Sequence, residues 1–299
     1  MSSVRRIALI GYGEVGQTLA ADLYAAGLYE LHAWDVLFDR PDSVPSGALA
    51  SGAVHAASSA AGPMRSADVV ISAVTASQCV EAARSASGCI ERDAYFIDLN
   101  SVSPATKAQA AHLIEAGGGR YIEAAVMSPI GPRRSASPML LGGPHAAAFM
   151  PIARALGFAG MRVYSDVVGR ASAAKMCRSV MVKGIEALLA ESLLAARHYG
   201  VEGDVLASLE DLLPVGDWER LARYMISRSL QHGERRADEM REVAKTVADA
   251  GLDPWMSEAC ASRQDWAARY GEFTAHEPLV AMLDAIRNAR REPAGVTSA

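Results

Sequence analysis

A glycine-rich turn near the start of the chain constrains its fold more than any other feature. The run Arg6–Ile10 is apolar after its first residue, and it leads through Gly11-Tyr-Gly-Glu-Val-Gly16 into a helical pattern over Val15–Ala26. A strand that enters a helix in this way leaves backbone N–H groups free at the helix start, and such groups attract phosphate. The segment predicts a pyrophosphate site formed by Gly11, Tyr12, Gly13, Glu14, Val15 and Gly16.

The three glycines and one acidic residue point to a dinucleotide. Gly11 permits the tight turn, Gly13 lets the backbone approach the pyrophosphate, and Gly16 allows close packing of helix on strand. Asp35 lies nineteen residues after Gly16, at the end of the next apolar run. A carboxylate there accepts hydrogen bonds from ribose hydroxyls and repels a 2′-phosphate, so NAD is expected and NADP is less favoured. Arg40 lies nearby and counts against a strict preference.

Short β-rich runs alternate with helical stretches, such as Pro104–Ala116, over roughly the first 165 residues. Near-continuous apolar strands between helices are typical of a parallel sheet covered on both faces. We therefore expect an α/β domain over residues 1–166, a Rossmann-type doubly wound parallel sheet. The expected strands are Arg6–Ile10, Leu31–Asp35, Val69–Val74, Tyr95–Leu99, Tyr121–Val126, Met139–Leu141 and Arg162–Tyr164.

The ends of two of these strands add candidates for the cofactor site. In open α/β sheets ligands bind outside the carboxyl ends of the strands. Val74 and Thr75 follow one such strand, and Asn100 and Ser101 follow the next. We expect these four residues to line the cofactor crevice.

The pattern changes after Asp166. Between Ser172 and Glu277 no run is typical of a strand, and Ala, Leu, Glu, Arg and Met recur with helical periods. An all-helical second domain is therefore expected over residues 167–299, fraying from about Arg291. Helix breaks are predicted at Gly200–Gly203, Pro214–Gly216 and Gly251–Pro254.

Composition excludes several classes of function. The formal net charge of −5 argues against a non-specific nucleic-acid binder. No stretch approaches the ~18 apolar residues of a membrane span, and the apolar run before Gly11 is too short for a signal peptide. The four cysteines show neither a CxxC pair nor zinc spacing, so we expect a cytoplasmic protein with reduced thiols and no metal. Cys177 is expected to be a small buried residue.

Four segments, taken in order, resemble the β-hydroxyacid dehydrogenases, a family that includes 3-hydroxyisobutyrate dehydrogenase and 6-phosphogluconate dehydrogenase. The segments are the glycine-rich turn, Asp-Val-Val-Ile-Ser-Ala-Val, Phe-Ile-Asp-Leu-Asn-Ser-Val-Ser-Pro and Tyr-Ile-Glu-Ala-Ala-Val-Met-Ser-Pro. The family usually has Asp-Ala-Pro-Val-Ser-Gly-Gly where this chain has residues 123–129, whereas its later Gly-Gly matches Gly142-Gly143. The resemblance implies an all-helical 6-phosphogluconate-dehydrogenase-like second domain. It also implies a homodimer, with apolar stripes from Ile185 to Ala196 buried against the partner.

The resemblance also implies a catalytic lysine. The family's Gly-x-x-x-x-x-Lys-x-x-Asn-Asn stretch matches Gly169 to Ser179, with Lys175 as the general acid/base and Arg178 and Ser179 in place of the two Asn. The family's substrate-contacting Asn is therefore not carried over. The Lys-x-Cys-Arg-Ser pattern and the following Lys183-Gly184 are similar to a subgroup with a phosphogluconate-dehydrogenase-like C-terminal domain of unknown function.

The residues themselves support a role for Lys175. Oxidation of an alcohol needs a base, and a lysine serves when burial or a neighbouring charge lowers its pKa. A polar stripe on an otherwise apolar helix is informative, because buried charge is paired or functional. Lys175 and Glu186 lie about 16 Å apart along such a helix, so one small substrate cannot touch both, and Lys183 and Glu186 are expected to pair or to support the dimer. The stripe comprises Ser172, Lys175, Ser179, Lys183 and Glu186, within an arc of about 80°.

Further candidates concern a small anionic substrate. Ser128 begins a loop after a strand end, where a hydroxyl and backbone N–H groups can bind a carboxylate, and Arg133 and Arg134 can add charge-assisted bonds. By resemblance, Arg236 replaces a lysine that the family places on a late helix. The expected substrate-binding residues are Ser128, Arg178, Ser179, His232 and Arg236, the last two sharing a helical face with Glu239.

Three functions stay open on sequence alone. The leading hypothesis is an NAD-dependent dehydrogenase that oxidises the hydroxyl of a small hydroxy acid, either a β-hydroxyacid or a sugar acid. The second is an imine or ketone reductase on the same scaffold; relatives of that kind tend to carry Asp or Tyr in place of the lysine, so Lys175 counts against it. The third is a non-catalytic NAD-binding protein, which needs no base.

Overall fold

The computed structural model of the chain describes residues 4–27 and 30–291. The chain divides into two compact units, Met1–Cys177 and Arg178–Ala299. The first unit extends past the predicted boundary at residue 166 because the start of helix α7 (Arg170–Tyr199) bonds to Glu123, a residue of the sheet. The predicted fraying beyond Arg291 lies outside the described residues.

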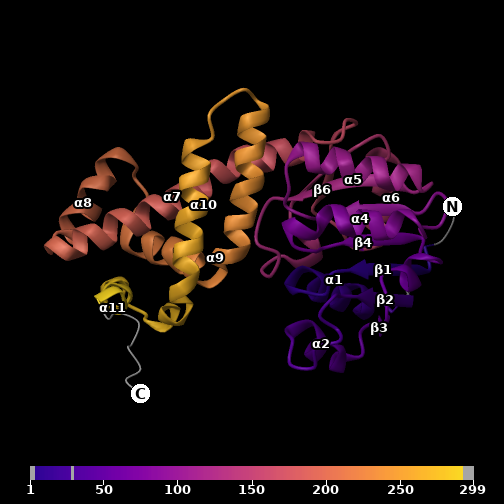
Figure 1. The fold of residues 1–299 in the computed structure, drawn as a ribbon, viewed down its shortest axis with the longest axis horizontal. Helices are drawn as coiled ribbons and strands as arrows, with labels where there is room; N and C mark the ends of the chain where they lie inside the picture. Colours follow the sequence, from indigo (N-terminus) through magenta and orange to yellow (C-terminus); the bar gives the residue numbers. More distant parts are fainter. Residues whose placement is uncertain (1–3, 28–29, 292–299) are drawn as a thin grey trace, which may run out of the picture. The chain divides into compact units, whose positions relative to one another are not determined.

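A sheet forms the centre of the first unit (Figure 1). It has eight strands in the order β3-β2-β1-β4-β5-β6-β7-β8. Neighbouring strands run parallel, apart from β6 and β7, which run antiparallel. The Rossmann-type α/β fold is thus confirmed, with one reversed connection. The strands are β1 Arg6–Ile10, β2 Glu30–Trp34, β3 His55–Ala56, β4 Val69–Ser72, β5 Tyr95–Asp98, β6 Arg120–Val126, β7 Met139–Gly142 and β8 Met161–Ser165.

The reversed connection and β3 are the two parts of the sheet that differ from expectation. Between β6 and β7 the chain forms no α-helix, only the 3₁₀ turn η3 (Arg134–Ala136), whereas a parallel pair is usually joined by a crossover helix. Periodicity gives no strand direction, so the purely parallel sheet was predicted wrongly at this point. Strand β3 has two residues, both exposed, so no apolar run marks it.

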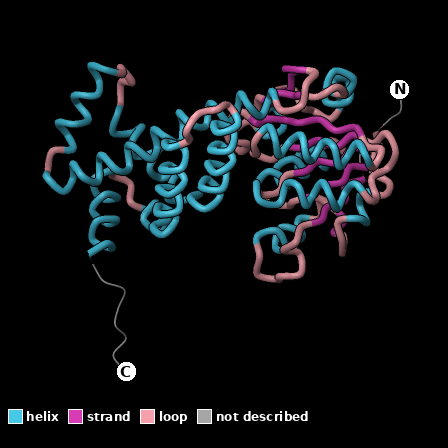
Figure 2. Tube along the Cα trace, turned by 45° about the horizontal axis from the view of Figure 1, so that its top comes forward, coloured by secondary structure: helices cyan, strands magenta, loops and turns pink. Residues whose placement is uncertain are grey.

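Helices cover both faces of this sheet (Figure 2). Alternate residues of a strand point to opposite faces, so Ile7 and Ile97 enter one apolar cluster, and Ala8 and Phe96 enter the other. Helices α1 and α6 contribute to the first cluster, and α3, α4 and α5 contribute to the second. The helices of the unit are α1 Glu14–Ala25, α2 Val44–Ala48, α3 Ala61–Met64, α4 Cys79–Ser87, α5 Pro104–Ala116 and α6 Ala146–Ala155, with the 3₁₀ turns η1 Leu49–Ser51 and η2 Ala76–Gln78.

The second unit is helical throughout its described residues, as predicted. It comprises the remainder of α7 with α8 Glu202–Leu212, α9 Trp218–Asp249, α10 Trp255–Ala267, η4 Ala268–Ala275 and α11 Leu279–Arg291. The breaks between α7, α8, α9 and α10 fall at the three predicted positions.

The apolar stripe of α7 is buried within the chain itself. Leu189 and Leu193 pack in one cluster with Ile226 of α9 and Ile286 of α11. The expectation that this stripe is buried against a partner subunit is therefore wrong for these residues, although Leu188 is 58% exposed. The homodimer itself stays a prediction.

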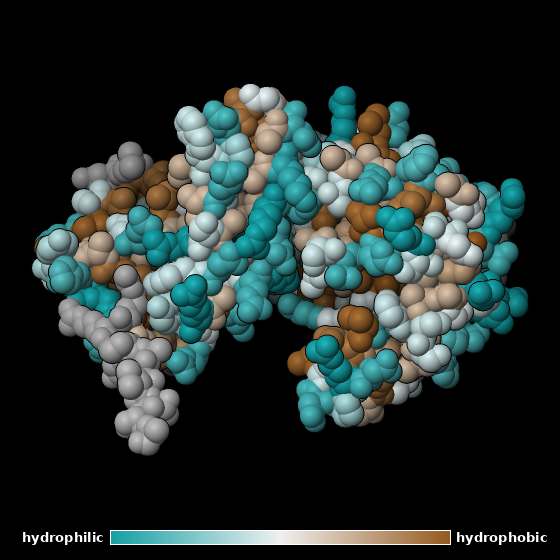
Figure 3. Space-filling view, in the orientation of Figure 1, coloured by the Kyte–Doolittle hydropathy of each residue, from teal (hydrophilic) through white to brown (hydrophobic). Residues whose placement is uncertain are grey.

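The surface of the helical unit is largely polar on the face that Figure 3 shows, where hydrophilic side chains cover much of α9 and α10. Arg241 of α9, for example, pairs with Asp238 at 2.8 Å and with Asp265 of α10 at 2.5 Å. Within the described ranges, no helix has both the length and the apolar character that spanning a bilayer requires.

Candidate active site

The glycine-rich turn has the geometry that its sequence predicts. Gly11 has a φ of +90°, and a Cβ there would lie 2.5 Å from the carbonyl oxygen of Ala73. A Cβ at Gly16 would lie 2.2 Å from the carbonyl oxygen of Gly11, whereas nothing lies within 4 Å of the Cβ position of Gly13. Gly13 also precedes α1 without a capping side chain, and the backbone of Glu14, Val15 and Gly16 forms the first turn. The open approach at Gly13 and the uncapped helix start fit a pyrophosphate.

Asp35 lies directly beside this turn. Its Oδ2 accepts a hydrogen bond from the backbone N–H of Tyr12 at 2.7 Å, and its Oδ1 accepts one from Leu37 at 2.9 Å. These two bonds fix the carboxylate where a ribose would follow the pyrophosphate. The Tyr12 side chain is buried against Phe38, and burial raises the pKa of its phenol. The contribution of Tyr12 to a dinucleotide site is therefore its backbone.

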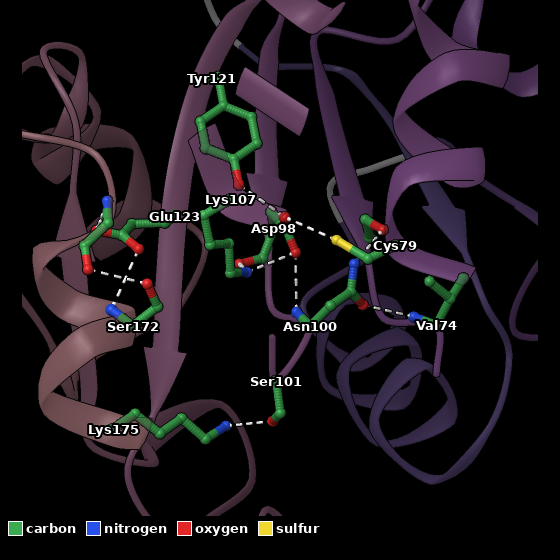
Figure 4. Close-up of polar contacts among 12 residues, drawn as sticks. Val74, Cys79, Asp98, Asn100, Ser101, Lys107, Tyr121, Glu123, Ser172 and Lys175 are labelled. Atoms are coloured by element: carbon green, nitrogen blue, oxygen red, sulfur yellow. Dashed lines mark hydrogen bonds and ion pairs between the residues drawn. The ribbon is translucent and has the colours of Figure 1, made fainter. Parts of the chain in front are cut away.

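Asn100 connects the two strand ends that were expected to line the crevice. Its Oδ1 accepts a hydrogen bond from the backbone of Val74 at 2.8 Å, and its Nδ2 donates to Ser72 Oγ at 3.0 Å. The side chain is only 4% exposed, so its amide holds the loops after β4 and β5 together (Figure 4). Thr75 is exposed and Ser101 is partly exposed, so these two side chains remain to face a ligand.

A buried ion pair lies within the same network. Asp98 and Lys107 are each 1% exposed by side chain and lie 2.7 Å apart. The carboxylate of Asp98 also accepts hydrogen bonds from Tyr121 Oη at 2.7 Å and from the backbone of Asn100 at 2.9 Å. Burial, reinforced by the charge of Asp98, raises the pKa of Tyr121. The sequence analysis missed this network, for which the only signal was a charged residue inside an apolar strand.

Lys175 and Ser101 were predicted separately and lie together. The Nζ atom of Lys175 donates to Ser101 Oγ at 2.5 Å, at the carboxyl end of β5 (Figure 4). Lys175 is partly buried. The arrangement places an amine beside a hydroxyl, at the edge of the sheet where the glycine-rich turn also lies. Such a pair can accept and release a proton.

The loop after β6 supplies fewer substrate contacts than expected. Ser128 is partly exposed, and its hydroxyl lies 3.2 Å from the carbonyl oxygen of Pro129. Arg134 bonds to Asp22 of α1 at 2.6 Å and to the carbonyl of Thr18 at 3.2 Å. The prediction of Arg134 as a substrate cation is therefore wrong, because its guanidinium holds the loop onto α1.

In the second unit, the polar stripe of α7 is matched by charges on α9. Lys183 Nζ lies 2.6 Å from Glu239 Oε2, and Glu186 is bound by Arg236. The expected pairing of Lys183 with Glu186 is therefore wrong, because each finds an opposite charge on the facing helix. Ser179 is 5% exposed, and its Oγ accepts a hydrogen bond from Lys183 at 3.4 Å.

The remaining substrate candidates also lie in the second unit. Arg178 is exposed, while Arg236 is engaged by Glu186, a carboxylate that is 2% exposed. Burial raises the pKa of Glu186, and the charge of Arg236 opposes that effect. Burial and the neighbouring arginines lower the pKa of His232 to about 4, so its imidazole is neutral at pH 7 and supplies no charge for an anion. A substrate role for these residues stays a prediction.

The cysteines are free, as the sequence indicates, but Cys177 is exposed and not buried as expected. It lies beside Arg178 on α7, and both side chains are on an exposed part of the helix. Among residues 4–27 and 30–291, no three or more His, Cys, Asp and Glu residues lie together as a metal site would require.

Comparisons with known proteins agree with this geometry. Residues 6–169 match the family described as NAD binding domain of 6-phosphogluconate dehydrogenase. Residues 196–267 match a second family, Domain of unknown function (DUF1932).

Individual relatives show the same relationship. The solved structure of a conserved hypothetical protein from Sinorhizobium meliloti 1021 is 35% identical, with a TM-score of 0.70 over 96% of this chain and 97% of that one. The mitochondrial 3-hydroxyisobutyrate dehydrogenase of Drosophila melanogaster is 27% identical over 69% of this chain. The matches to curated relatives span 61–62% of those relatives' length.

A more distant structure shares the fold alone. The imine reductase from Myxococcus stipitatus in complex with NADP+ is 17% identical, with a TM-score of 0.55 over 94% of this chain and 99% of that one.

Proposed function

Because this chain belongs to the β-hydroxyacid dehydrogenase family, with an NAD binding domain of the 6-phosphogluconate dehydrogenase kind, we propose that it is an NAD-dependent dehydrogenase of a small hydroxy acid. The observation that carries the proposal is the contact between Lys175 Nζ and Ser101 Oγ at 2.5 Å. It places a base candidate at the sheet edge where a dinucleotide is expected to bind.

The first unit carries residues that would hold the cofactor. The first turn of α1 would bind the pyrophosphate and Asp35 the adjacent ribose, while the loops after β4 and β5 would border the nicotinamide. A bound nicotinamide ring supplies the acceptor for a hydride. The fit rests on the open space at Gly13 and on the carboxylate that Tyr12 and Leu37 hold in place.

Lys175 would act on the hydroxyl of the substrate. The neutral amine of Lys175 would accept the proton of that hydroxyl as the carbon that bears it is oxidised to a carbonyl. In the reverse direction the same amine returns the proton. Ser101 keeps the amine in place through its hydrogen bond, and it can relay the proton onward because its hydroxyl both donates and accepts.

The proposal is tested by hydride transfer itself. The purified protein is incubated with NAD and a panel of β-hydroxyacids and sugar acids, and NADH is followed by its absorbance. We expect NADH to form with at least one member of the panel. Imines and keto acids with NADPH or NADH form a second panel, because turnover of imines alone would favour the reductase instead. Tight NAD binding without turnover in either panel would favour the non-catalytic alternative.

Cofactor choice gives a separate prediction. We expect NADH to bind more tightly than NADPH, because the Asp35 carboxylate would repel a 2′-phosphate. The change Asp35→Asn keeps the size of the side chain and an acceptor for Tyr12 or Leu37, and it removes the charge. Asp35→Asn should bring the Kd values for NADH and NADPH closer together, as measured by fluorescence titration with each cofactor. Equal affinities in the original protein would contradict the assignment.

A further inference from the structure

Glu123 lies in the middle of β6 and is fully buried. Its carboxylate accepts three backbone hydrogen bonds. Oε1 accepts from the N–H groups of Gly169 at 2.8 Å and Ala171 at 3.0 Å, and Oε2 accepts from the N–H group of Ser172 at 3.2 Å (Figure 4). These N–H groups belong to the start of α7, the helix that carries Lys175.

The carboxylate of Glu123 caps the start of α7 in place of the side chain that usually caps a helix from the residue just before it. The first N–H groups of a helix lack intrahelical partners, and a Ser, Thr, Asp or Asn just before the helix normally satisfies one of them. Here the residue before α7 is Gly169, with a φ of +95° and no side chain to offer. Glu123 satisfies the N–H groups from a different element, and its negative charge lies at the positive end of the helix dipole.

Gly142 makes room for this carboxylate. In the antiparallel pairing of β6 with β7, Gly142 lies opposite Glu123. A Cβ at Gly142 would lie 2.2 Å from Glu123 Oε1 and 2.8 Å from its Cγ. The glutamate and the glycine therefore form one steric unit, and the reversed strand β7 is what brings them together.

We propose that Glu123 is a positioning residue for the reaction, which holds the first turn of α7 against the sheet and thereby keeps Lys175 Nζ on Ser101. The proposal rests on the proposed function, because it assigns Lys175 the role of base. Lys175 is three residues beyond Ser172, so it follows the last anchored N–H within about one helical turn. A shift of that turn would displace the amine from the hydroxyl.

The change Glu123→Gln tests the charge with little change in volume. Glutamine keeps one acceptor oxygen and replaces the other with an NH₂ group, which cannot accept the hydrogen bond from the backbone N–H of Ser172. We expect kcat to fall about tenfold, since a loss of about 1.4 kcal/mol corresponds to that factor, while the Kd for NADH stays within about twofold. The matched control is Asp217→Ala, which removes the cap of α9, a hydrogen bond of 2.9 Å from the backbone N–H of Arg220, in the helical unit. It should lower stability as cap losses do and leave kcat unchanged.

A double-mutant cycle tests whether Glu123 and Gly142 act together on kcat. Gly142→Ala should lower kcat in the original protein, because the added methyl group displaces the Glu123 carboxylate. In a Glu123→Ala background the same change should have little effect, because the space is already empty. Additive effects of the two changes on kcat would overturn the proposal.

Two readouts do not depend on turnover. The backbone amides of residues 169–172 should exchange with deuterium faster in Glu123→Gln than in the original protein or in Asp217→Ala. The rate at which an acylating reagent labels the amine of Lys175 can be followed by mass spectrometry. This rate should change in Glu123→Gln and stay at the original value in the control variant. If the original protein transfers no hydride, the proposed function fails while these readouts still test the anchoring. If exchange, labelling and kcat all stay at the original values in Glu123→Gln, the positioning role is wrong.

Discussion

The change Lys175→Met is expected to reduce kcat by about 10²–10⁴-fold, the usual loss when a positioned general base is removed. Methionine fills a similar volume but cannot accept a proton, so the hydroxyl must lose its proton to water. Because the glycine-rich turn and Asp35 are untouched, the Kd for NAD should stay close to that of the original protein. Steady-state NADH formation and fluorescence titration measure the two quantities on the same preparation.

A second lysine provides the control for that experiment. Lys245 is 62% exposed by side chain and pairs with Glu242 in the helical unit. Lys245→Met makes the same chemical change in the helical unit and should leave kcat within about twofold. A Lys175→Met protein that turns over at nearly the original rate would remove the assignment of Lys175 as base.

The change Lys107→Met is expected to lower the free energy of unfolding of the first unit by about 3–5 kcal/mol. It leaves the carboxylate of Asp98 buried without its cation, in a place where both side chains are 1% exposed. That loss is large compared with the total stability of about 5–15 kcal/mol typical of a domain. The pair of Arg84 and Glu81 on α4, whose side chains are 59% and 64% exposed, offers the comparison in the same unit, since Arg84→Met should cost less than about 1 kcal/mol.

Urea unfolding followed by hydrogen exchange is the suitable measurement for this change. Peptides from β4, β5 and β6 report the sheet separately from the helical unit, and the two units need not unfold together. Equal losses of stability in Lys107→Met and Arg84→Met would contradict the importance of the buried pair.

Local patterns predicted much of the fold and part of the site. The glycine-rich turn, Asp35 and the strand ends at Val74 and Asn100 were found because each depends on residues close in sequence. Seven of the eight strands could be placed for the same reason, since a strand usually leaves a local run of apolar and β-branched residues. The helix breaks of the second unit followed from Gly and Pro.

The parts that the sequence did not predict depend on neighbours far along the chain. The direction of β7 goes with a connection that contains no crossover helix, and hydrophobic periodicity carries no information about direction. Glu123 differed from the family pattern by one methylene, but its role became clear only when Gly142 and the start of α7 lay beside it. Likewise, Arg134 was predicted as a substrate cation because a sequence does not show that Asp22 has already engaged it.

The paired charges between α7 and α9 have a consequence for how these helices recognise each other. Lys183 and Glu186 lie one turn apart on α7, and Glu239 and Arg236 lie one turn apart on α9, with the signs in matching order. If α9 slid by one turn, Lys183 would face Arg236, or Glu186 would face Glu239, in a buried place where repulsion is strong. The alternating signs thus permit one alignment of two long helices whose apolar faces alone would tolerate several. They also determine which leucines of α7 meet Ile226 of α9.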